Sequence, residues 1–117
     1  MEQSYKKYDI VLVDFGNNTD SEQSGIRPAI IVQNDMGNFF STSTIVMPIT
    51  SKQKKLNQPT HTLIKRTKSN GLNRDSVVLG ECLRQISKGR IVQLIGTLTE
   101  DYEREEIRRV YQANFGE

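Results

Sequence analysis

The segment that decides the fold reads SEQSGIRPAIIVQND, from Ser21 to Asp35. It opens with polar residues and Gly25, presents one cation at Arg27, and then runs apolar through residues 29–32. Pro28 cannot donate a hydrogen bond within a sheet, so it is tolerated at the start of a strand, and it biases Arg27 toward extended backbone. The pattern predicts a loop that delivers an arginine to the beginning of a buried strand, at the edge of a cleft. An ordinary strand with a solvated arginine is the alternative, and this segment alone does not decide between them.

One strand is predicted before this segment and several after it. Residues 8–15, YDIVLVDF, form an unbroken apolar run between polar flanks, which predicts a strand covered on both faces. Asn34 and Asp35 can cap a short helical turn that ends at Phe40. Further strands are predicted at 27–33, 42–50, 60–65, 75–86 and 90–97, and a helix at 100–113.

Four signals predict where these elements bend or end. Pro48 places an edge or a bulge in strand 42–50, and Gly80 breaks or bends strand 75–86. Asn70-Gly71 is a strong signal for a hairpin turn, and Thr99 is the expected cap of the C-terminal helix. The apolar residues of that helix available for packing are Tyr102, Ile107, Val110 and Tyr111. Because no strand–helix–strand alternation is present, the predicted fold class is mainly β with a C-terminal α-helix, a small antiparallel β-barrel formed as one domain by residues 1–117.

Length and composition exclude several classes of protein. A chain of 117 residues can bury one core without disulfide or metal support. No apolar run approaches the roughly 18 residues of a membrane span, and the N-terminus lacks the apolar segment of a secretory signal. The single cysteine, Cys82, excludes an internal disulfide and argues against a thiolate metal cluster. We therefore expect a soluble cytoplasmic protein without a membrane partner.

The charge is unevenly distributed along the chain. The formal net charge is +2, but residues 100–117 contain six acids and three arginines. Residues 52–68 contain six lysines and arginines and no acid. A basic stretch of this kind is what the binding of a polyanion such as RNA requires. A solvated lysine-rich loop would have the same composition and is the alternative.

Most catalytic motifs are absent from the sequence. It contains neither GxGxxG nor GxxxxGK[ST], and the only histidine, His61, excludes a histidine cluster for zinc. A Cys82–His61 dyad is conceivable, but Cys82 lies in an apolar stretch where a buried, inert thiol is favoured. No cofactor and no metal are expected.

The polar residues that remain suit the cleavage of RNA without a metal. In that reaction the ribose 2′-OH attacks the adjacent phosphate, so a protein must supply a cation for the phosphate oxygens, hydrogen-bond donors, and a route for protons. Arginine is a planar bidentate donor for phosphate, and a threonine hydroxyl can add a hydrogen bond to the developing charge. Simple RNA binding would need the same residue types. The candidate residues are Arg27, Thr50, His61, Glu81 and Arg84, with Ser21, Gln23 and Asn34.

Four segments resemble the MazF/PemK family of toxins from bacterial toxin–antitoxin pairs. They are KKYDIVLVDF at 6–15, SEQSGIRPAIIVQND at 21–35, TIVMPITS at 44–51 with PTH at 59–61, and RDSVVLGECLRQIS at 74–87. The resemblance implies an SH3-like antiparallel β-barrel with a C-terminal helix, and a homodimer whose RNA-binding grooves involve dimer contacts. It also implies a metal-independent, sequence-specific endoribonuclease for single-stranded RNA that leaves a 2′,3′-cyclic phosphate and a 5′-OH, and a cognate MazE-like antitoxin.

The resemblance also assigns roles to individual residues. Arg27 becomes the catalytic arginine and Thr50 the catalytic threonine. The expected RNA-binding residues are Ser21, Gln23, Asn34, Lys52, His61, Glu81 and Arg84. Two positions depart from the family pattern: Tyr8 replaces the usual glycine before the first strand, and Cys82 replaces a glutamine that can touch a base. Because the fold is shared with protein-directed toxins that poison a topoisomerase, such a toxin and a non-catalytic RNA-binding barrel are the alternatives.

Overall fold

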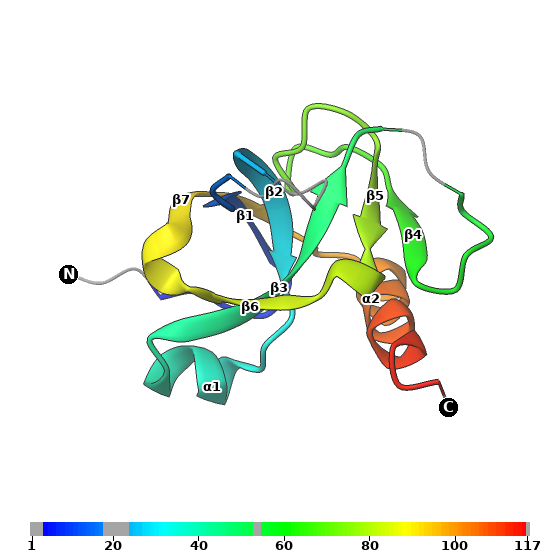
Figure 1. The fold of residues 1–117 in the computed structure, drawn as a ribbon. Helices are drawn as coiled ribbons and strands as arrows, with labels where there is room; N and C mark the ends of the chain where they lie inside the picture. Colours follow the sequence, from blue (N-terminus) through cyan, green and yellow to red (C-terminus); the bar gives the residue numbers. More distant parts are fainter. Residues whose placement is uncertain (1–3, 18–23, 53–54, 117) are drawn as a thin grey trace.

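A curved antiparallel sheet with two helices packed on it makes up the fold (Figure 1). The computed structural model describes residues 4–17, 24–52 and 55–116. The strands are β1 (Asp9–Asp14), β2 (Ile26–Ile31), β3 (Ser43–Thr50), β4 (His61–Ile64), β5 (Ser76–Leu79), β6 (Arg84–Ser87) and β7 (Ile91–Thr97). The helices are α1 (Asp35–Phe40) and α2 (Asp101–Ala113), with the 3-10 turns η1 (Gly80–Cys82) and η2 (Lys88–Arg90).

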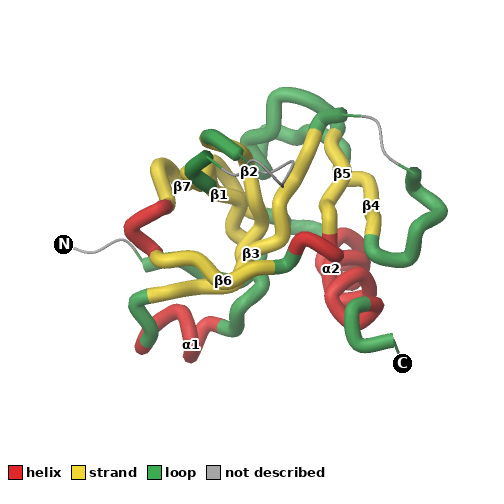
Figure 2. Tube along the Cα trace, viewed as in Figure 1, coloured by secondary structure: helices red, strands yellow, loops and turns green. Residues whose placement is uncertain are grey.

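The strand order is β4-β5-β3-β2-β1-β7, and β6 pairs with β3 outside this path. Figure 2 shows how the strands wrap around one another while α2 lies at the end of the sheet that carries β4 and β5. The prediction of a mainly β fold with a C-terminal helix is confirmed. Among the described residues, the ladders curve strongly but do not close into a continuous barrel.

Strand β3 is the centre of this arrangement because it pairs with three other strands. Residues 43–46 pair with β6, residues 46–48 with β2, and residues 49–50 with β5. Pro48 lies where the ladder to β6 has ended and the ladder to β5 has not yet begun, so its missing N–H leaves neither ladder short of a donor. The expectation of an edge or a bulge at Pro48 is therefore wrong, because β3 has partner strands on both sides and Pro48 lies where one of them changes from β6 to β5.

The core has two parts, one on each face of β1, β2 and β3. Ile10, Ile30 and Met47 pack with Ile107 and Val110 of α2 on one face. The other face buries a second cluster, made of Val11, Val13, Phe15, Ala29, Ile31, Val46 and Ile86. The unbroken apolar run in β1 is thus explained, because its alternate side chains enter different halves of the core.

The predicted strand 75–86 is broken at Gly80, as expected, into β5, η1 and β6. A Cβ atom at Gly80 would lie 2.7 Å from the carbonyl oxygen of Thr60 and 3.2 Å from that of Val110. Only glycine allows the backbone of η1 to approach β4 and α2 this closely. Cys82 lies in η1 and is half-buried, so the expectation of a buried strand cysteine is wrong.

The start of α2 and the connection before β5 also differ from the predictions. The N-cap is Glu100 rather than Thr99, and its carbonyl accepts hydrogen bonds from the N–H groups of Glu103 and Arg104. Glu103, Ile107 and Val110 form the buried face, and their spacing follows the helical period. Tyr102 lies outside this stripe, is 69% exposed, and does not join the core as expected, while Tyr111 is 42% exposed.

Asn70-Gly71 does not form a two-residue hairpin turn. Strands β4 and β5 do pair, but residues 65–75 connect them as a long loop. The Asn70 side chain is buried and bonds to backbone within this loop instead of closing a turn. In the described part of the chain, neither helix is long and apolar enough to cross a membrane.

Candidate functional site

Arg27 is the second residue of β2, and the loop before it fixes its side chain. Gly25 has φ of 75°, a conformation that glycine adopts without strain. The turn brings the carbonyl oxygen of Ser24 within 3.1 Å of Arg27 Nε, which donates to it. Among the described residues, the other nitrogens of the half-buried guanidinium have no hydrogen-bond acceptor. This is the arrangement that the sequence predicts for an arginine at a cleft edge.

Thr50 is the last residue of β3. Its Oγ1 accepts a hydrogen bond from the backbone N–H of Lys52 at 3.1 Å, which orients the hydroxyl. Ala29 of β2 and Pro48 of β3 form the last pair of their ladder, and Arg27 and Thr50 each lie two residues beyond that pair. Two neighbouring strands therefore present the guanidinium and the hydroxyl at the same end of the sheet.

Both residues line one cavity of about 270 Å³. The strand residues around it are Leu12, Arg27, Pro28, Ile49, Thr50, Ser76 and Ile95, and the loop residues are Ser51, Gly71, Leu72, Asn73 and Arg74. Among the described residues that line the cavity, Arg27 and Arg74 are the ionisable ones and none is an acid. Guanidinium, hydroxyl and amide groups are all able to donate hydrogen bonds to an anion.

His61 and Glu81 do not line this cavity. The His61 ring is buried, with Nδ1 2.7 Å from the carbonyl oxygen of Lys55 and Nε2 2.9 Å from Glu81 Oε2. Glu81 Oε1 also accepts a hydrogen bond from the hydroxyl of Thr60. Both ring nitrogens are therefore engaged, and the pair joins the chain before β4 to the turn after β5.

The pKa of Glu81 lies below its usual value. Burial of the carboxylate raises the pKa, but the hydrogen bonds from His61, from its own backbone N–H and from Thr60, together with the charge of His61, outweigh burial. Glu81 is consequently an ionised partner that holds His61 in place.

The remaining predicted residues lie in different parts of the molecule. Asn34 follows the far end of β2 and caps α1, since its Oδ1 accepts from the N–H of Gly37. Arg84 begins β6, and its guanidinium carbon lies 5.2 Å from the centre of the Phe15 ring. Lys52 is exposed two residues after Thr50. Ser21 and Gln23 fall outside the described residues.

Sequence reasoning did not identify Arg74, although it lies in the same cavity as Arg27. The sequence feature that could have pointed to Arg74 is its position at the start of the segment RDSVVLGECLRQIS, directly before β5. For metals, the described residues contain no group of three or more histidine, cysteine, aspartate or glutamate side chains that could hold an ion.

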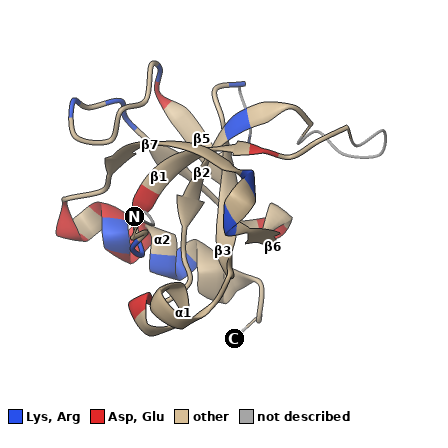
Figure 3. Cartoon of the chain, turned by 90° about the vertical axis from the view of Figure 1, so that its left-hand side faces the viewer, with Lys and Arg blue, Asp and Glu red and all other residues tan. Residues whose placement is uncertain are grey.

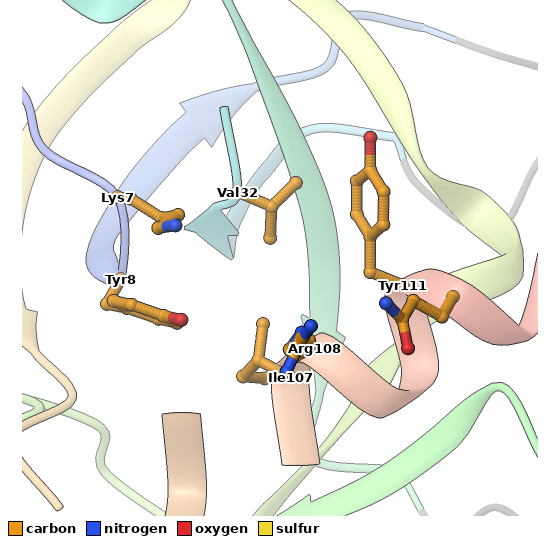
Figure 4. Close-up of a pocket in the computed structure, with 7 residues that line it drawn as sticks. Lys7, Tyr8, Val32, Ile107, Arg108 and Tyr111 are labelled. Carbon is orange, nitrogen blue, oxygen red and sulfur yellow. The ribbon is translucent and has the colours of Figure 1, made fainter. Parts of the chain in front are cut away.

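A second cavity, of about 280 Å³, lies between the N-terminal turn, the end of β2 and α2 (Figure 4). Tyr8, Val32, Ile107 and Tyr111 give it apolar walls, and its polar lining residues are Lys7, Arg108 and Gln112. It shares no lining residue with the cavity that contains Arg27. In Figure 3, acidic and basic residues both occur on α2, and basic residues with fewer acidic ones lie in the loops at the opposite end of the sheet.

The fold and the cavity together define a small, curved β-sheet protein with a cavity at one end of its sheet whose described lining is cationic. Residues 6–113 match the profile of the PemK-like, MazF-like toxins of type II toxin–antitoxin systems. The chain belongs to this family, as the sequence resemblance indicated.

Individual relatives agree with this assignment. The chain is 41% identical over 96 residues to Endoribonuclease EndoA of Bacillus subtilis (strain 168), covering 82% of each chain. It is 36% identical over 111 residues to Endoribonuclease MazF of Staphylococcus saprophyticus, covering 95% of this chain and 91% of the relative. A mycobacterial endoribonuclease solved in complex with its cognate antitoxin has the same fold, with a TM-score of 0.78 at 16% identity over 96% of this chain and 95% of that one.

Proposed function

We propose that this protein is the toxin of a type II toxin–antitoxin system and cleaves single-stranded RNA, chiefly mRNA, at specific sequences without a metal ion. The observation that carries the proposal is the shared cavity of Arg27 and Thr50, whose described lining residues include two arginines and no acid. The family match and the two relatives named as endoribonucleases support the same activity. Loss of mRNA would stop translation and growth in the cytoplasm.

The proposed reaction is an attack of the ribose 2′-OH on the adjacent phosphorus. A bond forms between O2′ and phosphorus while the bond from phosphorus to O5′ breaks, which leaves a 2′,3′-cyclic phosphate and a 5′-OH. The 2′-OH loses its proton and the O5′ leaving group gains one, so no other reactant is consumed. Arg27 neutralises the crowded phosphate oxygens, and charge that develops there is stabilised most strongly by donors fixed in advance.

Thr50 contributes a second, neutral donor. Its Oγ1 already accepts the N–H of Lys52, so its own hydroxyl hydrogen can point toward a phosphate oxygen. His61 is unsuited to the proton transfer because both of its ring nitrogens are engaged. Lys52, which follows Thr50 by two residues, together with Ser21 and Gln23, which precede Arg27 in the sequence, would guide the RNA strand.

The proposed partners follow from the same family. A MazE-like antitoxin would neutralise the toxin, because an acidic segment can occupy a cationic cavity in place of RNA. We also propose a homodimer as the functional unit.

Purified protein incubated with a long unstructured RNA in excess EDTA tests the activity. We expect cleavage, with fragments that carry 5′-OH ends. RNA that is bound but stays intact would instead identify a non-catalytic RNA-binding protein. If RNA is neither bound nor cut, a toxin that acts on a protein would be the remaining alternative.

Two substitutions test the proposed catalytic residues. We expect Arg27→Ala to abolish cleavage while RNA binding is largely kept, and Thr50→Ala to slow cleavage about 100-fold, the usual effect of removing one fixed donor. Arg108→Ala is the matched control, because this exposed arginine lies on α2 and outside the cavity. Rates of Thr50→Ala equal to those of the control would remove Thr50 from the mechanism, and an unfolded Arg27→Ala would make Arg27 a structural residue.

A further inference from the structure

We propose that Arg74 is a second RNA-backbone-binding residue, which holds a phosphate beside the one that is cleaved. This inference rests on the proposed ribonuclease function and extends it to a residue outside the two strands that supply Arg27 and Thr50. Arg74 lines the same cavity as Arg27. Two like charges in one cavity repel each other unless an anion lies with them, so the pair favours a ligand with more than one negative charge.

The loop that carries Arg74 is anchored to the sheet at its middle. Gly71 has φ of 71°, and a Cβ atom there would lie 2.1 Å from the carbonyl oxygen of Ile95 in β7. On the facing strand, a Cβ atom at Gly96 would lie 2.3 Å from the carbonyl carbon of Asn70. Two glycines therefore allow backbone to pack directly on backbone, and Thr97 N–H donates to the carbonyl oxygen of Ser69 at 2.9 Å.

Side chains fix the rest of this loop. Asn70 is 1% exposed and its amide donates to the carbonyl oxygen of Lys65, while its Oδ1 accepts from the N–H of Leu72. Leu72 is buried in the same core cluster as Ile10 and Ile30. The backbone of Arg74 is held as well, because the hydroxyl of Ser76 donates to its carbonyl oxygen at 2.8 Å.

These contacts place Arg74 on a rigid support while its side chain remains exposed. A cation that is positioned before the ligand arrives loses little conformational freedom on binding. Because Arg74 comes from a loop, whereas Arg27 and Thr50 come from adjacent strands, we assign it to the neighbouring phosphate rather than to the reacting one. It should therefore affect the binding of RNA more than the breaking of the bond.

Arg74→Ala, Arg74→Lys and Arg66→Ala, measured in the full-length protein, test this assignment. Arg66 is exposed on the same loop but does not line the cavity. The substitution Arg66→Ala therefore removes the same charge as Arg74→Ala without removing a residue of the cavity. For Arg74→Ala we expect KM to rise about tenfold or more, as for the loss of a charge-assisted hydrogen bond, with kcat nearly unchanged. The slope of log(kcat/KM) against log[salt] should become shallower by about 0.7, which corresponds to one phosphate contact on a single strand.

The lysine variant separates charge from structure. Arg74→Lys should restore the salt slope but only part of the KM, because lysine keeps the charge without the bidentate geometry. The proposal would be overturned if Arg74→Ala had the same KM and the same salt slope as Arg66→Ala. It would also be overturned if Arg74→Ala lowered kcat and left KM unchanged. Neither result would contradict the ribonuclease function, provided that the wild-type protein cleaves RNA in EDTA. RNA that the wild-type protein leaves intact would contradict the ribonuclease function itself.

Discussion

At the residue scale, Tyr8 occupies a backbone conformation that few residues adopt. Its φ is 79°, and it is the one non-glycine residue with positive φ in the described chain. The conformation is held on both sides, because its N–H donates to the carbonyl oxygen of Ile31 and its own carbonyl accepts from the N–H of Leu98. Two cations lie over the ring, with the Arg104 guanidinium carbon 4.7 Å and Lys7 Nζ 5.3 Å from its centre. These cation–π contacts offset strain that the usual glycine would avoid.

Glu81 gives a prediction about pH at the same scale. Its pKa is lower in the folded protein than its usual 4.5, so its stabilising effect is complete above that usual value and is lost as the pH falls through the folded pKa. We expect wild-type protein to melt at a higher temperature than Glu81→Gln at neutral pH. The difference should shrink in acid, where the carboxyl group is protonated in both the folded and the unfolded states.

Thermal melts of both proteins from neutral to acidic pH measure this difference. Glu105→Gln is the control, because Glu105 is exposed and contacts Arg108 across the helix surface at 3.6 Å. A gap between wild type and Glu81→Gln that does not change with pH would show that the Glu81 contacts do not depend on its ionisation. The side chain of Glu81 is 40% exposed, so water screens the interaction and the expected shift is small.

At the element scale, Arg109 fastens α2 to the chain around β4. Its guanidinium donates to both oxygens of Glu106, to the carbonyl oxygen of Pro59 at 3.0 Å and to that of His61 at 3.2 Å. Thr62 donates to the same Glu106 carboxylate. The hydrogen bond from Arg109, which exceeds the opposing effect of burial, lowers the pKa of Glu106.

We expect Arg109→Ala to lower the free energy of unfolding by about 1–2 kcal/mol, because it removes several partly exposed charge-assisted hydrogen bonds. Arg108→Ala, which removes the neighbouring arginine and one exposed ion pair, should cost less than about 0.5 kcal/mol. Urea denaturation of the two variants measures the contrast. If both variants lost the same free energy of unfolding, the hydrogen bonds from Arg109 to the backbone would contribute no more stability than an exposed ion pair does.

At the scale of the whole molecule, the sequence predicts what depends on local chemistry. The period of the apolar residues and the positions of Pro48 and Gly80 locate most strands, and the glycine and proline around Arg27 predict its place at the start of β2. What the sequence does not predict depends on distant contacts. Asn70-Gly71 has the composition of a tight turn, yet the packing of Gly71 on Ile95 makes it part of a long loop. For the same reason Arg74, which only this loop brings to the cavity, was not among the predicted residues.

Association between copies is a property of the whole molecule, and the surface of α1 bears on it. Helix α1 has six residues, and three of them are large and apolar with high exposure: Met36 at 69%, Phe39 at 76% and Phe40 at 75%. The two phenylalanine rings contact each other edge to face, with centres 4.8 Å apart. Clustered apolar side chains on a small protein mark surfaces that another molecule covers, so we expect α1 to take part in the proposed homodimer.

Sedimentation equilibrium should therefore give twice the chain mass of 13.4 kDa for the wild-type protein. The double substitution Phe39→Asp with Phe40→Asp should give the mass of one chain, because charges on both copies would have to be buried together. Its circular dichroism should match that of the wild type, since neither side chain belongs to the two core clusters. A wild-type mass of one chain would contradict the homodimer, whereas a dimeric double variant would place the interface on another face and leave α1 free for a different partner.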